Sequence, residues 1–241
     1  MIYTVTMNPS LDYLLSLPAL QAGETNRSAA ERLVAGGKGI NVSKMLYNLG
    51  TDSIIWGFAG GFSGEELCRQ LTAAGLRQEL IFLHNGNTRI NVKLSAGQET
   101  EVNAKGPQAE EEALQIFYRR LEALTAEDYV VLSGSLLPGM PCNSYRQIMQ
   151  QLQGRGVHFI VDTTGESLRE TLPLHPFLIK PNQRELEELF KTELTQRSQV
   201  AELAKQLQEM GAENVLVSLG GDGAVCVAAD GRIFDSRPPG G

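Results

Sequence analysis

Short apolar runs alternate with segments of helical periodicity along this chain. The apolar runs predict strands at Ile2–Met7, Ser53–Phe58, Tyr129–Leu132, His158–Val161, Phe177–Ile179 and Val215–Ser218. Apolar positions three and four residues apart predict helices at Gly39–Leu49, Gly64–Ala74, Glu110–Leu124, Ser144–Gln153, Arg184–Phe190 and Gln199–Met210. Several of the strands are apolar at every position, which is typical of strands buried on both faces. The alternation predicts an α/β fold with a mostly parallel sheet flanked by helices.

The segment "NTRINVKLSAGQETEVNAKG" follows a different pattern, with strict alternation of apolar and polar residues. The two faces of its first half carry Ile90, Val92 and Leu94 on one side and Arg89, Asn91 and Lys93 on the other. "SAGQ" turns the chain, and "ETEVN" alternates again with Glu101 and Asn103 polar. We expect a small antiparallel β-ribbon that projects from the α/β core. Its charged face would be a solvated edge if the ribbon stood alone.

Composition narrows the function without identifying it. The 241 residues suffice for one large domain or two small ones. A net charge of -7 and a pI of 5.1 argue against a nucleic-acid-binding surface. No apolar run approaches the roughly 18 residues of a membrane span, and the N-terminus lacks the pattern of a signal peptide. We therefore expect a cytoplasmic protein that binds neither nucleic acid nor membrane.

Glycines, small hydroxyl residues and isolated charges follow nearly every predicted strand. In open α/β sheets, ligands bind outside the carboxyl ends of the strands. The segments expected there are "NPSLD", "GFAGGFSG", "SGSLLPG", "DTTG", "KPNQRE" and "SLGGDG". Permissive backbone next to polar groups at so many strand ends predicts a site for a polyol and a phosphate.

The segment "LVAGGKGINVSKMLYNLG" places three glycines and Lys38 directly before a helix. Backbone N–H groups at such a helix start can approach an anion, Lys38 adds a positive charge, and Asn41 can bind a hydroxyl. The alternative is a flexible turn with a solvated lysine. The spacing matches neither the Walker A loop nor the dinucleotide fingerprint.

Two further segments each support a structural and a functional interpretation. In "PNQRELEEL", Asn182 and Glu185 have the spacing of a capping box, while Glu185 could also hold magnesium-bound water and Lys180 could reach a nucleotide phosphate. In "VSLGGDGAV", the glycines could wrap nucleotide phosphates or form a turn into the hairpin "AVCVAADGRIF". Arg89 and Lys93 on the polar ribbon face could clamp an anionic substrate.

Six motifs in order give the chain a family resemblance. They are "NPSLDY", "AGGKGINVSKMLYNLG", "NTRINVKL…ETEVN", "SGSLLPG", "KPNQRELEEL" and "VSLGGDGA". Together they resemble the ribokinase-like sugar kinases, the phosphofructokinase B family, over nearly the whole chain. The sequences of these motifs are most similar to the bacterial branch that converts fructose 1-phosphate and ATP into fructose 1,6-bisphosphate. Tagatose-6-phosphate kinases are its sibling branch.

The resemblance implies a fold, ligands and roles for individual residues. The implied architecture is one α/β kinase core over residues 1–241, truncated at its C-terminus, with lid segments at about 11–35 and 86–105 that can pair subunits into a homodimer. The implied cofactors are ATP and Mg²⁺, with Glu185 as the metal residue. The residues implied to bind the sugar phosphate are Asp12, Gly37, Lys38, Asn41, Arg89, Asn91, Lys93, Asn103 and Ser135. Those implied to face ATP are Lys180, Asn182, Glu185, Ser218, Gly220, Gly221 and Gly223.

One departure from the family pattern concerns catalysis. The family has a "GAGD" motif whose glycine amides form an anion hole and whose aspartate is the general base, and this sequence, which ends in "RPPGG", does not contain it. We therefore name no catalytic residue and expect the chain as written to transfer phosphate poorly. The alternatives are a tagatose-6-phosphate kinase, a kinase for an unphosphorylated sugar, and a non-catalytic sugar-phosphate sensor. A dinucleotide-dependent oxidoreductase is disfavoured because no fingerprint follows the first strand.

Overall fold

The computed structural model describes residues 1–237, and residues 238–241, the end of "RPPGG", lie outside the described part. The chain forms two compact units. The N-terminal unit comprises Thr4–Phe117 and Leu136–Met140, and the C-terminal unit comprises Met1–Tyr3, Tyr118–Ser135 and Pro141–Gly241. Among residues 1–237, no helix is both long enough and apolar enough to cross a membrane.

The core of the N-terminal unit is a sheet with the strand order β1-β4-β5. These strands are β1 (Ile2–Thr6), β4 (Ser53–Gly60) and β5 (Arg77–Leu83), and the helices are α1 (Lys38–Asn48), α2 (Gly61–Ala73) and α3 (Glu111–Leu121). Of β1 only residues 4–6, and of α3 only residues 111–117, belong to this unit. Every residue of β4 is buried, as its continuous apolar sequence predicted, and β4 pairs with β5 in parallel. Helix α1 packs against β4, and α2 packs against both β4 and β5.

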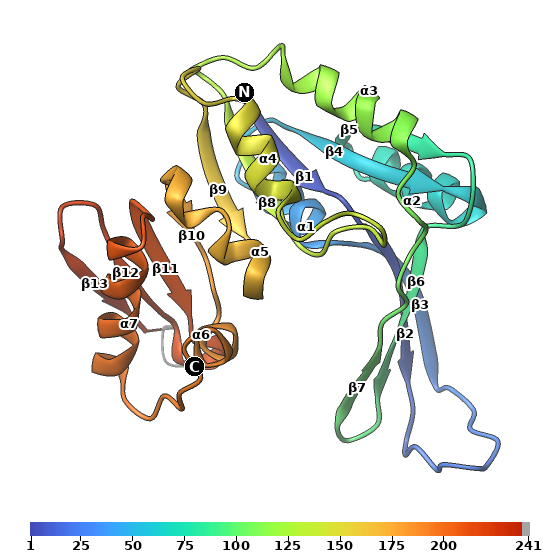
Figure 1. Ribbon diagram of the computed structural model, residues 1–241. Coiled ribbons are helices and arrows are strands. Elements are labelled where there is room, and N and C mark those ends of the chain that lie inside the picture. The colour runs from blue at the N-terminus through green and yellow to red at the C-terminus, as the bar shows by residue number, and fades with distance from the viewer. Residues whose placement is uncertain (238–241) are drawn as a thin grey trace. The chain divides into compact units, whose positions relative to one another are not determined.

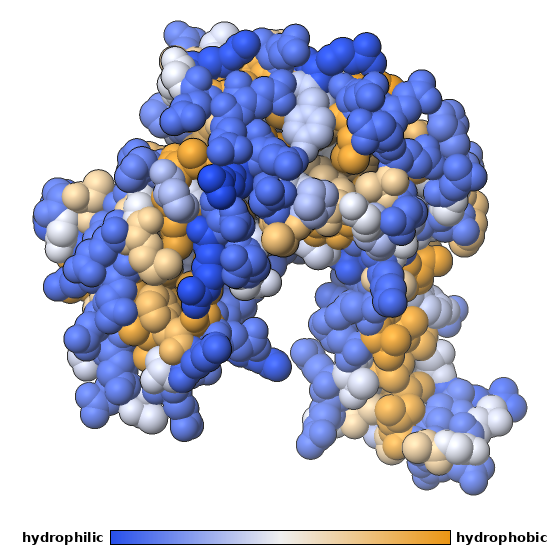
Figure 2. All heavy atoms as spheres, viewed as in Figure 1, coloured by the Kyte–Doolittle hydropathy of each residue, from blue (hydrophilic) through white to orange (hydrophobic). Residues whose placement is uncertain are grey.

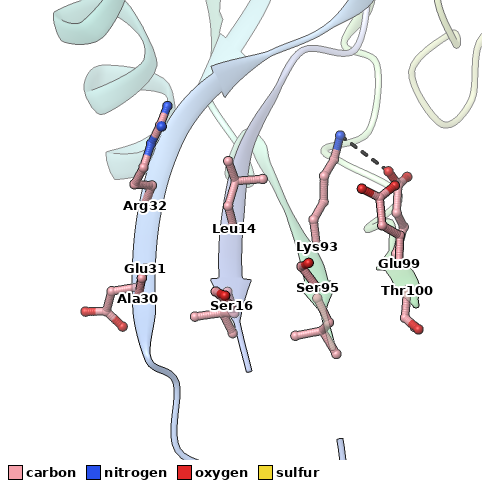
Figure 3. A pocket seen from close by; sticks show the side chains of 12 residues that line it. Leu14, Ser16, Ala30, Glu31, Arg32, Lys93, Ser95, Glu99 and Thr100 are labelled. Carbon is pink, nitrogen blue, oxygen red and sulfur yellow. Dashed lines mark ion pairs between the residues drawn. The ribbon is translucent and has the colours of Figure 1, made fainter. Parts of the chain in front are cut away.

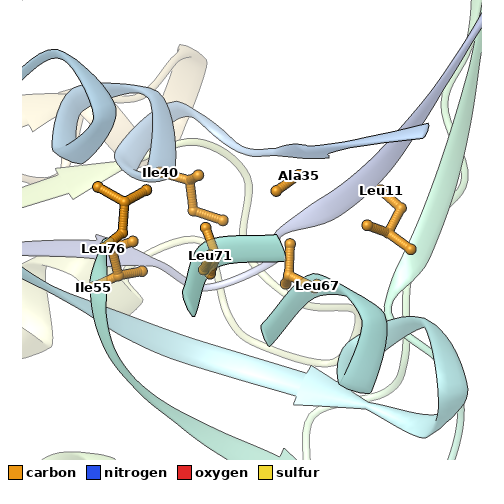
Figure 4. Packing of buried hydrophobic residues seen from close by; sticks show 7 residues of the cluster. All are labelled: Leu11, Ala35, Ile40, Ile55, Leu67, Leu71 and Leu76. Carbon is orange, nitrogen blue, oxygen red and sulfur yellow. The ribbon is translucent and has the colours of Figure 1, made fainter. Parts of the chain in front are cut away.

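A cluster of aliphatic side chains joins the two helices to the sheet (Figure 4). It consists of Leu11, Ala35, Ile40, Ile55, Leu67, Leu71 and Leu76. Leu11 and Ala35 belong to strands outside the core sheet, so the cluster also fixes the point at which the second sheet of this unit leaves the core.

The second sheet of the N-terminal unit is four-stranded, with the order β3-β2-β6-β7 (Figure 1). Its strands are β2 (Ser10–Ser16), β3 (Ala30–Gly36), β6 (Arg89–Ser95) and β7 (Glu99–Val102). We call it the lid sheet. Strands β6 and β7 form the predicted antiparallel hairpin, but β2 pairs with β6 in parallel, in a register that sets Ser10 opposite Arg89 and Asp12 opposite Asn91.

The ribbon does not stand alone, so the solvated edge expected in that case does not arise: β6 lies between β2 and β7. Asn91 on that face is only 4% exposed, whereas Ile90 on the apolar face is 37% exposed. Asn91 is therefore the one buried residue of β6. Such burial of an amide requires hydrogen-bond partners, which are described below.

The C-terminal unit contains a mostly parallel sheet with the order β13-β12-β11-β10-β9-β8. Strands β8 (Tyr129–Ser133), β9 (His158–Asp162), β10 (Leu178–Ile179) and β11 (Asn214–Ser218) are parallel, and β12 (Ala224–Val227) and β13 (Ile233–Ser236) form an antiparallel hairpin on β11. The helical segments are α4 (Ser144–Gln151), α5 (Gly165–Arg169), η1 (Leu172–Leu174), α6 (Gln183–Phe190), α7 (Arg197–Glu209) and η2 (Gly220–Asp222). The parallel strands of both units and their helices confirm the predicted α/β class.

Two of the segments expected at the carboxyl ends of strands belong largely to strands or helices. Most of "NPSLD" belongs to β2, which begins at Ser10. In "GFAGGFSG", β4 continues to Gly60 and α2 begins at Gly61, with no loop between them. A Cβ at Gly57 would lie 2.0 Å from the carbonyl oxygen of Thr6, so this glycine serves close strand packing rather than a ligand loop.

We predict that Leu71→Ala lowers the free energy of unfolding by about 2–5 kcal/mol, because Leu71 is fully buried in the aliphatic cluster and its loss leaves a cavity. The control is Leu49→Ala, since Leu49 is 71% exposed and its removal should change stability by less than about 0.5 kcal/mol. Urea unfolding of both variants measures the difference. Equal effects would mean that the cluster does not form the core.

Candidate functional site

Asp12 of β2 is the centre of a polar network in the N-terminal unit. Its Oδ1 accepts hydrogen bonds from the Ser10 hydroxyl at 2.7 Å and from the Asn91 amide at 3.0 Å. Its Oδ2 lies 3.0 Å from the Lys93 ammonium, which also lies 3.5 Å from Glu101 of β7. The parallel register of β2 and β6 produces this arrangement, because it sets these side chains in neighbouring rows on one face of the lid sheet.

Three cations act on this single carboxylate. Burial alone would raise the pKa of Asp12, but the hydrogen bond from Ser10, the contact with Lys93 and the hydrogen bond from Asn91 together lower it below its ordinary value. Burial lowers the pKa values of Arg89 and Lys44, and the negative charge of Asp12 offsets part of that effect in both. Burial also acts to lower the pKa of Lys93, but Asp12 and Glu101 raise it overall. The surroundings of Asp12 thus carry an excess of positive charge that suits an anionic ligand.

Arg89 lies at the start of β6, where it ties three segments together. Its guanidinium donates to the carbonyl of Asn8 at 3.2 Å and to that of Ala104 at 3.4 Å. The Ala104 N–H in turn donates to the Asn91 side chain at 3.2 Å. Asn91 therefore bonds both Asp12 and the exit of the lid sheet, which explains its burial.

Asn103 is exposed and, within residues 1–237, makes no hydrogen bond with Asp12, Arg89 or Asn91. Its amide reaches only Glu101, at 3.5 Å. Among the described contacts it is a peripheral member of the predicted set.

The glycine-rich turn lies directly beside Asp12. A Cβ at Gly36 would come within 2.8 Å of the Asp12 carboxylate carbon and 2.7 Å of the Ser10 hydroxyl, so only glycine lets these groups approach the backbone. Gly37 caps α1, and Lys38 is the first residue of that helix. Lys38 is half-buried and Asn41, one turn later, is exposed. The structure thus brings Asp12, Gly37, Arg89, Asn91 and Lys93 into one unit with the helix start.

Three residues near this site went unnoticed in the sequence. Asn8 donates through its amide to the carbonyls of Lys105 at 2.8 Å and Leu136 at 3.2 Å, Ser10 bonds Asp12, and Lys44 adds positive charge to its surroundings. Asn8 and Ser10 stand inside the quoted "NPSLD", which was a signal. No feature of the sequence pointed to Lys44, because a lysine on an amphipathic helix is normally solvated.

The predicted nucleotide-facing residues lie in the C-terminal unit. The Lys180 ammonium lies 3.4 Å from Asp162, a buried carboxylate at the end of β9. The capping box at the start of α6 is confirmed, because the Asn182 side chain accepts from the Glu185 N–H at 2.8 Å and Glu185 accepts from the Asn182 N–H at 2.9 Å. An isolated parallel bridge joins Asn182 to Ser218.

The glycine loop after β11 leads into a hairpin, as its structural interpretation predicted. Its segment Gly220–Asp222 is a 3₁₀ turn, and Gly223 has a φ of 94° with its Cα packed against the carbonyl of Ser236. Positions Gly220 and Gly221 border open space. The loop therefore joins β12 and still offers open backbone at those two glycines. Ser135, predicted to bind sugar phosphate, is exposed and follows β8 in this same unit.

The lid sheet also carries an apolar cavity of 380 Å³ away from the core (Figure 3). It is lined by Leu14, Leu15, Ser16, Ala30, Glu31, Arg32, Lys93, Leu94, Ser95, Glu99, Thr100 and Glu101. Its lining combines leucine side chains with charged side chains of both signs.

We predict that Lys93→Met destabilises the fold by about 0.5–1 kcal/mol at pH 7, because the lost ion pair is partly exposed. The lowered pKa of Asp12 contributes stability above its unfolded pKa, and this contribution is lost as pH falls through the lower folded pKa. The difference between wild type and variant should therefore shrink below about pH 4. Urea unfolding from pH 7 downward measures it, with Lys105→Met, an exposed lysine of the same unit, as control. A difference that stays constant with pH would contradict the ion pair.

Comparisons with known proteins agree with this architecture. Residues 5–240 match the pfkB family of carbohydrate kinases. The chain is 39% identical to a 1-phosphofructokinase of Bacillus subtilis, over 100% of this chain and 79% of that protein. It is 32% identical to a D-tagatose-1-phosphate kinase of Bacillus licheniformis, over 98% of this chain and 81% of that protein.

Solved structures give the same assignment. Phosphofructokinase-2 of Escherichia coli in complex with fructose-6-phosphate superposes with a TM-score of 0.91 at 31% identity, over 99% of this chain and 80% of that one. A tetrameric inhibited form of that enzyme gives a TM-score of 0.90 at 31% identity, over 99% of this chain and 79% of that one. Fold, motif order and sequence similarity agree, and the chain belongs to the pfkB family of carbohydrate kinases.

Proposed function

We propose that this chain takes part in the ATP-dependent phosphorylation of fructose 1-phosphate to fructose 1,6-bisphosphate. The observation that carries the proposal is the excess of positive charge around Asp12, supplied by Lys44, Arg89 and Lys93. A neutral sugar would need hydroxyl-binding groups only, whereas a phosphorylated sugar also needs cations for its phosphate. The relatives named 1-phosphofructokinase support fructose 1-phosphate as that sugar.

In this proposal, the N-terminal unit binds the sugar phosphate. Arg89, Lys93 and Lys38 hold the phosphate already on the substrate. The sugar hydroxyls bind to Asp12, Asn41, Asn91 and Asn103, with the Gly37 backbone at the helix start. The lid sheet covers the sugar and excludes water, which would otherwise compete as phosphoryl acceptor.

The nucleotide side falls to the C-terminal unit. ATP is the phosphoryl donor, and its phosphates face Lys180, Asn182 and the glycine loop from Ser218 to Gly223. The transferred phosphoryl group spreads negative charge, which N–H groups and a lysine stabilise.

Magnesium is the metal that this proposal requires, and the residues present fit it. Among residues 1–237, no group of three or more histidine, cysteine or acidic side chains forms a ready metal site. Mg²⁺ on a nucleotide needs no such cage, because it keeps waters and phosphate oxygens as ligands and takes one or two carboxylates. Glu185 would supply a carboxylate there, and the ion would neutralise charge on the nucleotide phosphates.

The lid sheet also gives the proposal a partner, a second copy of this chain. Figure 2 shows an apolar patch along this sheet, and leucines and charged residues line its cavity. Val102 at the far edge is 60% exposed. Pairing of two lid sheets would cover this patch and form a homodimer. Cytoplasmic ATP and sugar phosphates place the reaction in the cytoplasm.

Calorimetric titration tests the substrate assignment. We expect fructose 1-phosphate to bind more tightly than tagatose 1-phosphate, tagatose 6-phosphate, fructose 6-phosphate and fructose. We also expect Arg89→Met to weaken fructose 1-phosphate binding by about 10–100-fold, since it removes a charge-assisted contact with phosphate, and to leave ATP binding unchanged. The matched control is Arg77→Met, an exposed arginine of β5 in the same unit.

Each outcome of the titration is informative. Preference for a tagatose phosphate would keep the kinase class and change the sugar. Equal binding of fructose and its phosphates would contradict the role of the cations, and absence of sugar binding by the folded chain would overturn the proposal. A sensor that lacks transfer would bind the sugar phosphate but show no ADP formation with ATP.

We predict that Glu185→Gln separates the two roles of this side chain. Glutamine at this position keeps the capping box, so the melting temperature should change little. It removes the carboxylate charge, so the enhancement of ATP binding by Mg²⁺ should fall about tenfold. Titration of ATP with and without Mg²⁺ measures this effect, and an unchanged enhancement would exclude Glu185 as the metal residue.

A further inference from the structure

Within residues 1–237, one edge of strand β3 pairs with no strand. It is the first strand in the order β3-β2-β6-β7, so its hydrogen bonds to β2 use only one side of its backbone. At the other side, the backbone groups near its end still need partners, and Ala35 is only 6% exposed, which keeps water from serving that role.

Gln70 of α2 supplies partners for this edge. The Ala35 N–H donates to Gln70 Oε1 at 2.7 Å, and Gln70 Nε2 donates to the carbonyl of Leu33 at 3.1 Å. One side-chain amide thus accepts from a residue and donates to the residue two positions earlier, as a neighbouring strand would do. Gln70 Nε2 also donates to Glu66 at 2.8 Å.

Glu66 holds the Gln70 amide in place. Arg69 contacts Glu66 through two hydrogen bonds of 2.7 Å, and Arg69 and Gln70 together lower the pKa of Glu66 to about 2. Glu66 therefore remains an ionised acceptor at neutral pH. The orientation of the Gln70 amide is fixed by this acceptor and by its two contacts with β3.

Lys44 of α1 completes the contact. Its ammonium donates to the Ala35 carbonyl at 2.5 Å. Both backbone groups of Ala35 that face away from β2 are therefore bonded to side chains of the core helices. The next residue is Gly36, whose Cα lies against the Asp12 carboxylate, and then come Gly37 and Lys38.

We propose that Gln70 and Lys44 are positioning residues that set the end of β3, and through it the glycine turn, against Asp12 for sugar-phosphate binding. This role rests on the proposed function of the turn. A displacement of Ala35 would move Gly36 away from the row of Ser10 and Asp12, because the register of β3 on β2 pairs Gly36 with Ser10. We call Gln70 and Lys44 together the clamp. Both side chains hold the end of β3 and do not themselves contact a ligand.

The experiment compares Gln70→Met with wild type in the whole chain. Methionine keeps the length and apolar stem of glutamine and removes both hydrogen bonds to β3. The matched control is Gln115→Met on α3, because the Gln115 amide donates to Glu111, four residues earlier, as Gln70 does to Glu66. Gln115 makes no contact with the lid sheet among the described hydrogen bonds.

Two readouts are measured on each protein. Amide hydrogen exchange at Ala35 should become about tenfold faster in Gln70→Met and stay unchanged in Gln115→Met. The dissociation constant for fructose 1-phosphate should rise about tenfold in Gln70→Met, with the ATP dissociation constant unchanged. Lys44→Met should also weaken sugar-phosphate binding, and Lys44→Arg should restore most of it because the guanidinium still donates to the Ala35 carbonyl.

The readouts separate the failure of this inference from that of the proposed function. Unchanged exchange at Ala35 would overturn the clamp whatever the ligand. Faster exchange with unchanged sugar-phosphate affinity would reduce Gln70 to a structural contact and overturn its positioning role. If wild type binds no sugar phosphate, the proposed function fails and the positioning role fails with it. Amide hydrogen exchange at Ala35 still reports whether Gln70 contacts β3.

Discussion

The parallel pairing of β2 with β6 is the contact on which the polar network around Asp12 depends. The two strands are more than seventy residues apart in the sequence, and their register decides which side chains share a row. It sets Asp12 beside Asn91 and Ser10 beside Arg89. A shift by one residue would turn Asp12 to the other face of the sheet and set Leu11 or Tyr13 in its place. The hydrogen bonds from Ser10 and Asn91 and the ion pair with Lys93 all follow from this one register.

The sequence predicted the core better than the lid. Strand β4 and the parallel strands of the C-terminal unit could be predicted because continuous apolar runs bury both faces. The hairpin of β6 and β7 could be predicted because its residues are neighbours in sequence and alternate strictly. Strands β2 and β3 could not, since "SLDYLLS" and "AERLVAG" do not alternate cleanly and find their partners only in the folded chain.

The site was predicted in the same uneven way. Asp12, Lys38 and Arg89 followed from motifs shared with a kinase family, whereas residue types alone gave only a polyol and phosphate site. Lys44 and Gln70 were missed because each lies on an amphipathic helix where a polar side chain is normally solvated. Their partners are backbone atoms of another element, and no pattern in the sequence encodes such a contact. The capping box of Asn182 and Glu185 shows the converse, because a local motif can be recognised from four consecutive residues.

The unpaired edge of β3 has a consequence for solubility. A free strand edge can recruit a strand of another molecule, which is a common route to aggregation. On β3 the inner part of this edge is occupied by the Gln70 amide, and the outer part carries the charged residues Glu31 and Arg32. A foreign strand would have to displace the Gln70 amide at one end and approach the charged side chains of Glu31 and Arg32 at the other. Strand addition at this edge is thereby disfavoured.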